Sequence, residues 1–536
     1  MYTITTPIPY VNGEPHLGHL LEHIHNDVIA RFRRRIESQP ALFTIGADQH
    51  GLKIMEKALE LNIPTKQFVD RQAEVFETLW KKYEISYDEF VPTSSENHRI
   101  LSQIIFNNLY SKGFIYQKEY EGNYCVGCED FYAPSQLNED ECCPIHLTKP
   151  IITKEKNYFF SLSKFQSQVG EFLTTARIVP ESNRGEWLNF IVEGLQDISI
   201  SREQSRLPWG IPIEIDGTAT DQVMYVWFEA LLNYLTAMVN PETFDRYREL
   251  VVERKAIELE IMDEIKSSLP IDFWFGGKDI AKFHLVIFPA ILSALDLPWT
   301  INSRIHGFIN DANGHKFSKS LNNAVYPLEL EEKFGVEGSR YVMLAEVSTS
   351  SDTNWDWNRV VDSHNAQLGN NLGNVVMRVS TLIEKYFDGI IDLDQDFEVL
   401  AKVEDELEQK VEGIVEGRVE AEVQNNLQNN LKLNFEPVYS LLHEFETQKA
   451  IQTLFQEVTK INLFLETTKP WSLAKDMETN GVEIKRILTL CAKAIVDTGA
   501  VLSIFLPDTG AKLVEIFTQP KITKAEVMFP KVELEK

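Results

Sequence analysis

The N-terminal part of the chain alternates between strand-like and helix-like patterns, and this alternation limits the possible folds more than any other feature. Residues 2–8 are rich in Thr and Ile, as a buried strand would be, and they end at the turn-forming stretch 9–15. Over residues 17–36 apolar side chains recur at intervals of three and four, which is typical of a helix. A second apolar strand over 41–46 is followed by a helix from about Leu52. This order predicts a parallel α/β sheet, whose ligands bind at the carboxyl ends of the strands.

The length of 536 residues exceeds what one hydrophobic core supports, so three or four domains are expected. Residues 115–160 interrupt the α/β pattern with Gly, Cys, Tyr and Pro, as a small inserted domain would. The pattern resumes near 187–325, and beyond about residue 355 it is almost entirely helical. The expected segments are the first half of an α/β domain (1–114), an inserted domain (115–186), the second half of the α/β domain (187–300), a connecting region (301–354) and an all-α domain (355–536).

The composition, with 43% hydrophobic and 25% charged residues, is typical of a soluble globular protein. No apolar run approaches the roughly 18 residues of a membrane span, and the N-terminus lacks the basic and apolar regions of a secretory signal. We therefore expect a cytoplasmic protein without membrane contact. The net charge of 52 − 80 = −28 disfavours general nucleic-acid binding, because phosphate recognition needs local Lys and Arg. An acidic chain can nevertheless carry one basic groove.

Four of the five cysteines lie close together in the inserted segment, at Cys125, Cys128, Cys142 and Cys143. A tight cluster in a long chain indicates a metal site rather than a disulfide framework. A Cys-x-x-Cys pair followed by a Cys-x-x-His pair that ends at His146 offers three thiolates and an imidazole, a four-coordinate set suited to structural Zn²⁺. With every position filled by the protein, the zinc would have no open site for catalysis.

The stretch Pro15-His16-Leu17-Gly18-His19 falls at the first strand-to-helix junction. A helix N-terminus presents free N–H groups and the positive end of the dipole, which suits phosphate. Gly18 lets a flat base approach the backbone, and His16 and His19, one turn apart, can reach the same phosphates. Taken alone, a His-x-x-His pair is more often structural, so this motif by itself is weak.

A second motif, Lys316-Phe317-Ser318-Lys319-Ser320, lies in a polar loop preceded by a glycine. Its two lysines can neutralise the charge that develops as pyrophosphate leaves, although each lysine alone would be interpreted as an ordinary exposed residue. A His-x-Gly-His element near the N-terminus and a Lys-x-Ser-Lys-Ser loop 316 − 16 = 300 residues later resemble those of class I aminoacyl-tRNA synthetases. In that family an aminoacyl adenylate forms, and the acyl group then passes to the terminal adenosine of tRNA.

Within that class, five stretches resemble the methionyl-tRNA synthetases from residue 1 to about residue 480, in the same order. They are Thr5-Thr6-Pro7-Ile8-Pro9-Tyr10-Val11-Asn12-Gly13, Ala47-Asp48-Gln49-His50-Gly51, Tyr225-Val226-Trp227-Phe228-Glu229-Ala230-Leu231-Leu232-Asn233-Tyr234, Gly277-Lys278-Asp279-Ile280 with His284, and Leu372-Gly373-Asn374-Val375-Val376-Met377-Arg378 with Lys469-Pro470-Trp471. The resemblance implies a Rossmann-like catalytic domain with an inserted zinc-knuckle domain, followed by an α-helical anticodon-binding domain.

The resemblance also implies roles for single residues. Asp48 would accept the substrate ammonium through a charge-assisted hydrogen bond. Aromatic side chains would surround the thioether of L-methionine, which favours such contacts. The implied methionine pocket consists of Ile8, Tyr10, Asp48, Trp227, Ala230, Leu231, Tyr234, Ile280 and His284. ATP, with Mg²⁺, would contact His16, Gly18, His19, Gly277, Lys278, Asp279 and Lys319, and the catalytic groups would be His16, His19, Lys316 and Lys319.

For the zinc, the Cys-Pro-Ile-His spacing of the family's knuckle favours Cys143 over Cys142, giving Cys125, Cys128, Cys143 and His146 as ligands. For tRNA, Asn374 and Arg378 would read base edges and Trp471 would stack on an unpaired base. A packing anchor between helices is an alternative role for Trp471. No dimerising module is expected after the helical domain, so a monomer is the simpler expectation.

Three positions depart from the family pattern. Phe317 stands where Met is common, Gln49 where Glu is usual, and Glu229 where Asp is usual. Leucyl, isoleucyl and valyl enzymes are an alternative, but their large editing domain would not fit between the two motifs. A paralogue that activates methionine without charging tRNA is another, and it is distinguished by assaying amino-acid activation and tRNA charging separately.

Overall fold

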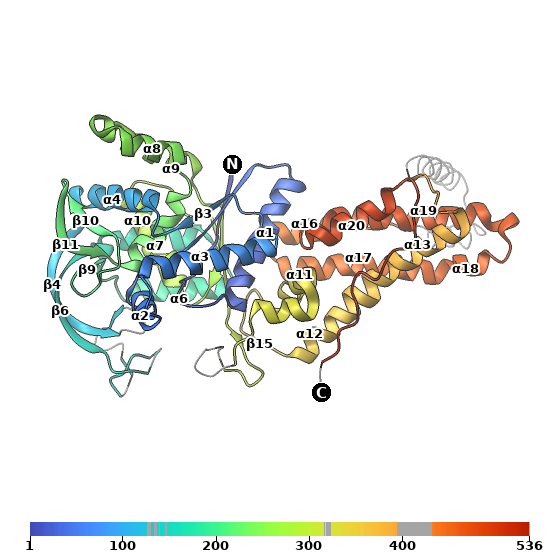
Figure 1. Ribbon diagram of the computed structural model, residues 1–536, viewed down its shortest axis with the longest axis horizontal. Coiled ribbons are helices and arrows are strands. Elements are labelled where there is room, and N and C mark those ends of the chain that lie inside the picture. Colours follow the sequence, from blue (N-terminus) through green and yellow to red (C-terminus); the bar gives the residue numbers. More distant parts are fainter. Residues whose placement is uncertain are drawn as a thin grey trace. The chain divides into compact units, whose positions relative to one another are not determined.

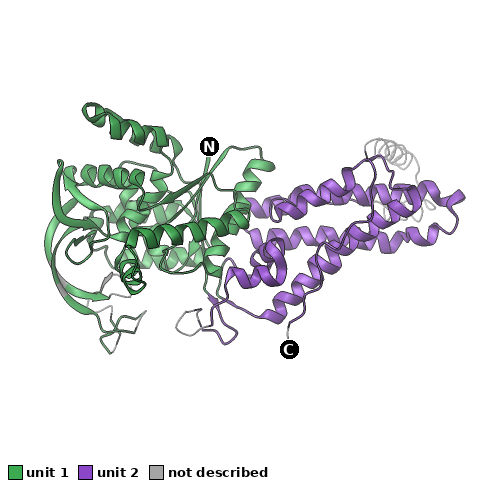
Figure 2. Ribbon diagram, viewed as in Figure 1, with its two compact units in different colours: residues 1–308, 350–352 green, residues 309–349, 353–536 purple. Residues whose placement is uncertain are grey.

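The computed structural model describes the chain except for residues 126–129, 133–136, 139, 145–146, 316, 318–322, 394–430 and 535–536. The chain divides into two compact units (Figure 2), of which unit 1 comprises residues 1–308 and 350–352 and unit 2 comprises residues 309–349 and 353–536.

The centre of unit 1 is a six-stranded sheet in which every pair of neighbouring strands is parallel (Figure 1). In spatial order its strands are β3 (Glu89–Pro92), β2 (Ala41–Ala47), β1 (Tyr2–Thr5), β12 (Phe273–Gly277), β13 (Asn302–His306) and β7 (Arg177–Val179). The parallel α/β sheet expected from the sequence is confirmed. Strands β2, β1 and β12 are parallel neighbours, so the segments that follow them leave the sheet at the same edge.

The elements expected at the N-terminus are present. Strand β1 ends at Thr5 rather than continuing to residue 8, because Pro7 and Pro9 have no N–H group to donate to a strand ladder. The helix after it, α1 (Leu17–Arg35), begins at His16, whose side chain accepts hydrogen bonds from the backbone of the first turn. The other helices of unit 1 are α2 (Leu52–Glu60), α3 (Thr65–Lys82), α4 (Glu96–Ser111), α5 (Gln166–Thr175), α6 (Glu181–Val192), α7 (Val226–Thr236), α8 (Pro241–Glu249), α9 (Arg254–Ser268) and α10 (Phe288–Ala294), with the shorter helical turns η2 (Leu162–Phe165), η3 (Val251–Glu253) and η4 (Phe283–Ile287).

Two antiparallel sheets lie in the middle of the unit 1 sequence. The larger has the order β5-β4-β6-β8, and the smaller has the order β10-β11-β9. Their bounds are β4 (Ile115–Cys125), β5 (Asp130–Tyr132), β6 (Ile151–Phe160), β8 (Ile198–Ser199), β9 (Ser201–Glu203), β10 (Pro212–Ile215) and β11 (Thr218–Met224). The long β4–β6 hairpin begins where the sequence predicted an insertion.

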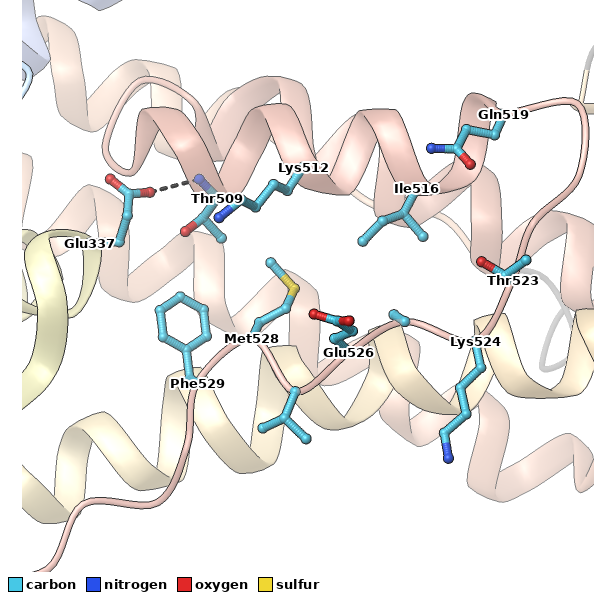
Figure 3. A pocket seen from close by; sticks show the side chains of 12 residues that line it. Glu337, Thr509, Lys512, Ile516, Gln519, Thr523, Lys524, Glu526, Met528 and Phe529 are labelled. Carbon is cyan, nitrogen blue, oxygen red and sulfur yellow. Dashed lines mark hydrogen bonds between the residues drawn. The ribbon is translucent and has the colours of Figure 1, made fainter.

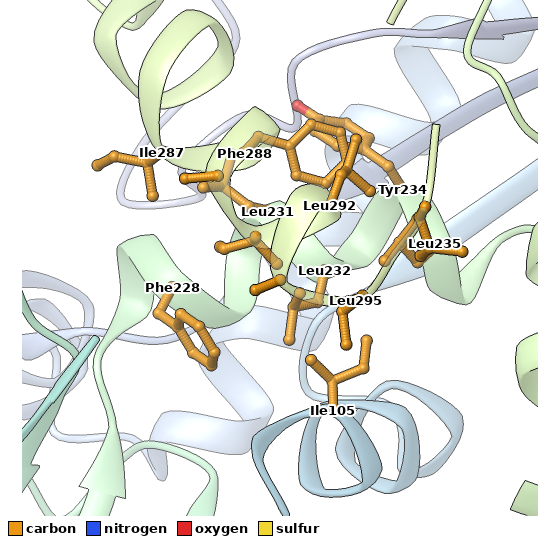
Figure 4. Close-up of a cluster of buried hydrophobic side chains, with 14 of the residues drawn as sticks. Ile105, Phe228, Leu231, Leu232, Tyr234, Leu235, Ile287, Phe288, Leu292 and Leu295 are labelled. Atoms are coloured by element: carbon orange, nitrogen blue, oxygen red, sulfur yellow. The ribbon is translucent and has the colours of Figure 1, made fainter. Parts of the chain in front are cut away.

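Helix α7 is buried along most of its length and forms part of the main core of unit 1. Figure 4 shows Phe228, Leu232 and Leu235 of this helix among the apolar side chains of α4 and α10. Its approach to strand β2 requires a glycine at position 46, because a Cβ there would lie 2.8 Å from Asn233 Oδ1 and 2.5 Å from the Val91 carbonyl oxygen.

Unit 2 is largely helical, apart from the short parallel pair β14 (Ile309–Asn310) and β15 (Thr353–Asn354). Its described helices are α11 (Pro327–Glu346), α12 (Trp357–Ser363), η5 (His364–Gly373), α13 (Asn374–Phe387), α16 (Glu436–His443), α17 (Thr447–Thr468), α18 (Pro470–Leu473), α19 (Met477–Leu502) and α20 (Pro507–Thr518). Helix α19 packs against α13, α17 and α20. None of the helices within the described ranges combines the length and apolarity needed to span a bilayer.

Candidate functional site

The first turn of α1 is organised by its two histidines. The backbone N–H groups of Gly18 and His19 donate to His16 Nδ1 at 3.1 and 3.4 Å, and the His16 N–H donates to His19 Nδ1 at 3.3 Å. The two rings stack with centroids 3.6 Å apart. A ring nitrogen that accepts carries no proton, so each neutral imidazole has its proton on Nε2, where it can be donated to a phosphate oxygen. The structure thus brings together the two histidines that the sequence motif predicted.

One turn further along α1, Glu22 joins the helix to the ends of two strands. Its Oε1 accepts a hydrogen bond from the Gly277 N–H at 3.0 Å and lies 3.2 Å from His306 Nε2. Burial raises the pKa of the Glu22 carboxyl, although His306 acts against the shift. No motif in the sequence pointed to Glu22 or His306. The signal for Glu22 was its spacing of three from His19, which places both on one helix face.

The segment after β12 carries the predicted adenosine contacts. Gly277 is buried, and a Cβ there would lie 2.7 Å from Asp279 Oδ1, so a larger residue would displace the Asp279 side chain. Lys278 and Asp279 are exposed, and the Lys278 ammonium lies 2.7 Å from Asp352 Oδ1. This segment and the first turns of α1 are linked through Glu22, which places both predicted ATP-binding stretches at one edge of the sheet.

A buried carboxylate lies beside Tyr10. Asp48 is only 2% exposed, and its backbone forms a parallel bridge with Tyr10. The Asp48 N–H donates to the Pro9 carbonyl at 2.9 Å, and the Val11 N–H donates to the Asp48 carbonyl at 3.1 Å. The segments after β1 and β2 are therefore held together where the sequence predicted an ammonium-binding carboxylate next to an aromatic ring. Ile8, on the same segment as Tyr10, is partly exposed.

Tyr234, His284 and Trp274 form a buried aromatic group. The Tyr234 hydroxyl donates to His284 Nε2 at 2.7 Å, and His284 Nδ1 donates to the Ile280 carbonyl at 3.0 Å. Burial lowers the pKa of His284 to about 4, so the imidazole is neutral at physiological pH. The Trp274 ring stacks on the imidazole with centroids 4.2 Å apart. Trp274 was not identified from the sequence, because it lies within an apolar strand pattern that looks like ordinary core.

Three further residues predicted for the amino-acid pocket, Trp227, Ala230 and Leu231, lie on the same face of α7 as Tyr234. Trp227 is partly exposed, and its ring stacks on Phe283 with centroids 4.1 Å apart. Ala230 and Leu231 are buried on the next turn. Trp227 and Phe283 also line a cavity of about 740 Å³ that extends to β4 and β6. Of the residues predicted for the amino-acid pocket, Trp227 alone lines this cavity.

The loop predicted to bind polyphosphate is described only at its base. Lys316 and Lys319, with Ser318 and Ser320, lie outside the described residues. Before the loop, Asp311 accepts hydrogen bonds from the Asn313 and His315 N–H groups at 2.9 Å, and after it Asn323 Nδ2 donates to Asp311 at 2.9 Å. The Asn323 hydrogen bond and these backbone donors lower the pKa of Asp311 to about 2. One ionised carboxylate therefore holds both ends of the loop.

Two of the four predicted zinc ligands are described. Cys125 and Cys143 are buried, at 1% and 0% exposure, whereas Cys142 is partly exposed and its Sγ lies 3.5 Å from the Asp140 carbonyl. Cys128 and His146 lie outside the described residues. Across the part of the chain that is described, no three metal-ligating side chains gather, and a site that includes those two residues would not be found there. Two buried thiols, with Cys143 more buried than Cys142, fit the predicted ligand set.

The residues predicted to bind RNA come together in unit 2. Arg378 on α13 pairs with Glu466 on α17 at 2.8 Å, and its guanidinium carbon lies 4.9 Å from the centre of the Trp471 ring. Trp471 is partly exposed, and Asn374 is partly exposed one turn before Arg378. The ring of Trp471 is therefore not fully covered by neighbouring helices.

A second cavity, of about 410 Å³, lies in unit 2 between α20 and the segment 519–529 (Figure 3). The Thr509 N–H at the start of α20 donates to Glu337 Oε2 at 2.7 Å. None of the residues predicted from the sequence to have a function lines this cavity.

Comparisons with known proteins agree on one family. The family model of class I tRNA synthetases (M) matches residues 2–146 and 132–380. The methionine–tRNA ligase of Caldanaerobacter subterraneus subsp. tengcongensis is 33% identical, over 100% of this chain and 79% of that protein. The methionine–tRNA ligase of Streptomyces coelicolor is 32% identical, over 96% of this chain and 88% of that protein. Among solved structures, Mycobacterium tuberculosis methionyl-tRNA synthetase in complex with methionyl-adenylate is 28% identical with a TM-score of 0.79, covering 96% of this chain and 93% of that one.

Proposed function

The chain belongs to the class I methionyl-tRNA synthetases, and on this premise we propose that it activates L-methionine with ATP and transfers the methionyl group to the 3′-terminal adenosine of tRNA. The observation that carries the choice of methionine is the buried group of Tyr234, Trp274 and His284. With its imidazole neutral, this group presents an uncharged and polarizable surface, which suits a thioether. None of these three side chains would pair with a charged amino-acid tail.

The opposite end of the substrate binds at Asp48. A buried carboxylate recognises an ammonium group through a charge-assisted hydrogen bond. Such a hydrogen bond is stronger inside the protein than in water, because the local dielectric constant is lower. Tyr10 lies beside it through their backbone bridge. The remaining wall of the methionine pocket comprises Ile8, Trp227, Ala230, Leu231 and Ile280.

ATP binds across the N-terminus of α1 and the segment after β12. In the first reaction a methionine carboxylate oxygen attacks the α-phosphorus, the bond from that phosphorus to the β-bridging oxygen breaks, and pyrophosphate leaves with the electron pair. His16 and His19 donate to the phosphate oxygens, with Gly18 allowing close approach. Gly277, Lys278 and Asp279 hold the adenosine and ribose. Lys316 and Lys319, aided by Mg²⁺ carried with ATP, neutralise the leaving pyrophosphate.

The inserted domain carries one structural Zn²⁺, bound by Cys125, Cys128, Cys143 and His146. The buried thiols of Cys125 and Cys143 support this set, since structural zinc sites are closed by protein ligands. Bound by four protein ligands, the ion would cross-link the segment between β4 and β6. It would have no open coordination position and would take no part in the reaction.

The helical unit binds the anticodon of tRNA through Asn374, Arg378 and Trp471. The partly exposed ring of Trp471 beside a guanidinium supports this role, because unpaired bases stack on aromatic and guanidinium planes. The protein acts as a monomer in the cytoplasm.

Two assays on the purified protein test this function. ATP–pyrophosphate exchange should depend on methionine and not on leucine, and methionine should be esterified to tRNA. A paralogue that only activates methionine would perform the exchange without charging tRNA. Absence of methionine-dependent exchange would refute the proposed function altogether.

A further inference from the structure

A fully buried carboxylate lies behind the amino-acid pocket, and the reaction described above does not use it. Glu229 on α7 is 0% exposed. Its Oε1 accepts a hydrogen bond from His50 Nδ1 at 2.9 Å, and its Oε2 accepts one from His98 Nε2 at 2.8 Å. Removing a carboxylate from water is costly unless both oxygens are satisfied, so the two imidazoles make this buried charge possible. Burial would raise the pKa of Glu229, but the two histidines outweigh burial and lower it.

The hydrogen bonds of Glu229 join three separate elements. His50 lies in the segment after β2, and His98 lies on α4. The far side of His98 is also fixed, because its Nδ1 lies 2.8 Å from Thr236 Oγ1 at the end of α7. Helix α7 is therefore attached to α4 through the hydrogen bonds of Glu229 and Thr236 with His98. It is attached to the segment after β2 through the hydrogen bond of Glu229 with His50.

Glu229 lies on the same helix as the pocket residues of α7 but on a different face of it. At 100° per residue, the pocket side chains of α7 share one face and the polar side chains share another. The pocket face carries Trp227, Ala230, Leu231 and Tyr234, and the polar face carries Glu229, Asn233 and Thr236. Asn233 attaches the polar face of α7 to a further element, since its Nδ2 donates to the Val91 carbonyl of β3 at 2.7 Å.

The segment that contains His50 also carries Asp48, two residues earlier. Between them, Gln49 fixes the segment from its other sides: its Oε1 accepts from the Ser94 hydroxyl at 2.7 Å, and its Nε2 donates to the Val69 carbonyl at 2.9 Å. The Trp209 indole donates to the Gln49 carbonyl at 2.6 Å. His50 is thus the residue through which this segment is attached to α7.

We propose that Glu229 is a positioning residue for methionine: through His50 it holds the segment that carries Asp48 against the helix that forms the side-chain wall of the pocket. The inference rests on the proposed function. The ammonium acceptor and the wall belong to elements 179 residues apart in sequence, measured from His50 to Glu229, so their separation depends on contacts of this kind. A small error in that separation weakens binding of a ligand that must touch both.

The length of the side chain matters for this role. A glutamate has one methylene more than an aspartate, and here its two oxygens reach histidines on two different elements. The shorter carboxylate of an aspartate at position 229 would keep the charge but lose reach, and a glutamine would keep the reach but lose the charge. The two substitutions therefore test different parts of the proposal.

The experiment compares Glu229→Gln and Glu229→Asp with Glu155→Gln. Glu155 is a matched control because it is a buried carboxylate of unit 1, 5% exposed, that accepts hydrogen bonds from Arg206 and Asn157 on the β6 side of the unit. Each variant is measured by ATP–pyrophosphate exchange, with separate KM values for methionine and ATP. Methionine is also titrated alone, with the intrinsic fluorescence of the pocket tryptophans as the signal. A melting temperature is recorded for each protein.

For Glu229→Gln we expect the KM for methionine to rise about 10-fold to 100-fold, while the KM for ATP changes by less than about twofold, since charged hydrogen bonds are lost at one end of the site. Glu229→Asp should lie between Glu229→Gln and the unaltered protein, and Glu155→Gln should leave both KM values unchanged. The Kd for methionine alone should follow the KM.

An unchanged KM for methionine in Glu229→Gln, or equal rises for methionine and ATP, would overturn the proposal and make Glu229 a packing residue. If Glu229→Gln does not fold, the split between the two KM values in Glu229→Asp decides in the same way. Failure of the unaltered protein to bind methionine would instead refute the proposed function, so the two failures are distinguishable.

Discussion

Burial lowers the pKa of His284 to about 4, because the ring is surrounded by Trp274 and Tyr234 rather than by water. An unfolded histidine has its ordinary pKa of about 6.5, so the unfolded chain takes up a proton between pH 6.5 and pH 4 that the folded chain does not. Stability therefore falls as the pH is lowered through this window, and above pH 6.5 the full stability is present. In the folded chain the neutral ring that suits a thioether is maintained throughout this window and is lost only below about pH 4.

This linkage can be measured with His284→Gln, whose amide oxygen can still accept from Tyr234. Between pH 7 and pH 5 the free energy of unfolding should fall by about 2 kcal/mol less in the variant than in the unaltered protein, since one pKa unit corresponds to about 1.4 kcal/mol. Urea unfolding followed by tryptophan fluorescence gives both values. Equal pH dependence in the two proteins would mean that His284 titrates normally in the folded state.

Lys319 is predicted to act only when charge develops on the leaving pyrophosphate. Lys319→Ala should therefore slow methionine-dependent pyrophosphate exchange by about 10²-fold to 10³-fold, the usual cost of removing one group that stabilises such charge. Methionine binding measured by fluorescence should stay within about twofold of normal. If the exchange rate is unchanged, the loop has no role in activation.

Local elements could be predicted well, because their patterns repeat within a few residues. The strand at 2–8, the helix at 17–36 and the strand at 41–46 are present as β1, α1 and β2. The error at the end of β1 has a local cause as well, since Pro7 and Pro9 cannot donate to a ladder.

Contacts between distant segments were harder to predict. Glu22 lies 284 residues from His306 in sequence, and no periodic pattern connects them. Trp274 gave no signal either, since an aromatic residue inside a buried parallel strand looks like core. The candidate residues Tyr10, Asp48, Tyr234 and His284 could be predicted because family motifs contain them. The motifs did not reveal the hydrogen bonds from Glu229, although the sequence did mark Glu229 as unusual.

Between β5 and β6, the zinc prediction chooses Cys143 over its neighbour Cys142 as a ligand. Purified without chelators, the protein should contain about one zinc per chain. Cys143→Ser should lose the metal because its thiol is fully buried, whereas Cys142→Ser should keep it because that thiol is partly exposed. Metal analysis of both variants by mass spectrometry tests this. Zinc lost from Cys142→Ser and kept in Cys143→Ser would reverse the choice of ligand.

On the scale of the whole chain, the predicted methionine pocket and the predicted RNA site belong to different compact units. All nine predicted methionine-pocket residues lie in unit 1, whereas Asn374, Arg378 and Trp471 lie in unit 2. The sequence placed the start of the helical domain at 355, and the division observed falls after residue 308, with residues 350–352 returning to unit 1. Periodicity could not reveal this, because the short pair β14 and β15 carries too few residues to form a pattern.

A substitution in the helical part of unit 2 can therefore impair tRNA charging without impairing methionine activation. Trp471→Ala should weaken tRNA charging by the value of one base stack, about 1–3 kcal/mol in binding, mainly as a higher KM for tRNA. Methionine-dependent pyrophosphate exchange without tRNA should remain normal, because the residues predicted to carry it lie in unit 1 or in the loop at 316–320, and none of them is on α18, which carries Trp471. A matched variant, Trp187→Ala, alters a partly exposed tryptophan of unit 1 and should leave the KM for tRNA unchanged. If Trp471→Ala lowers charging, exchange and the melting temperature together, then Trp471 is a packing anchor. The partly exposed ring beside Arg378 favours the first result, since a ring that holds helices together would be covered by them.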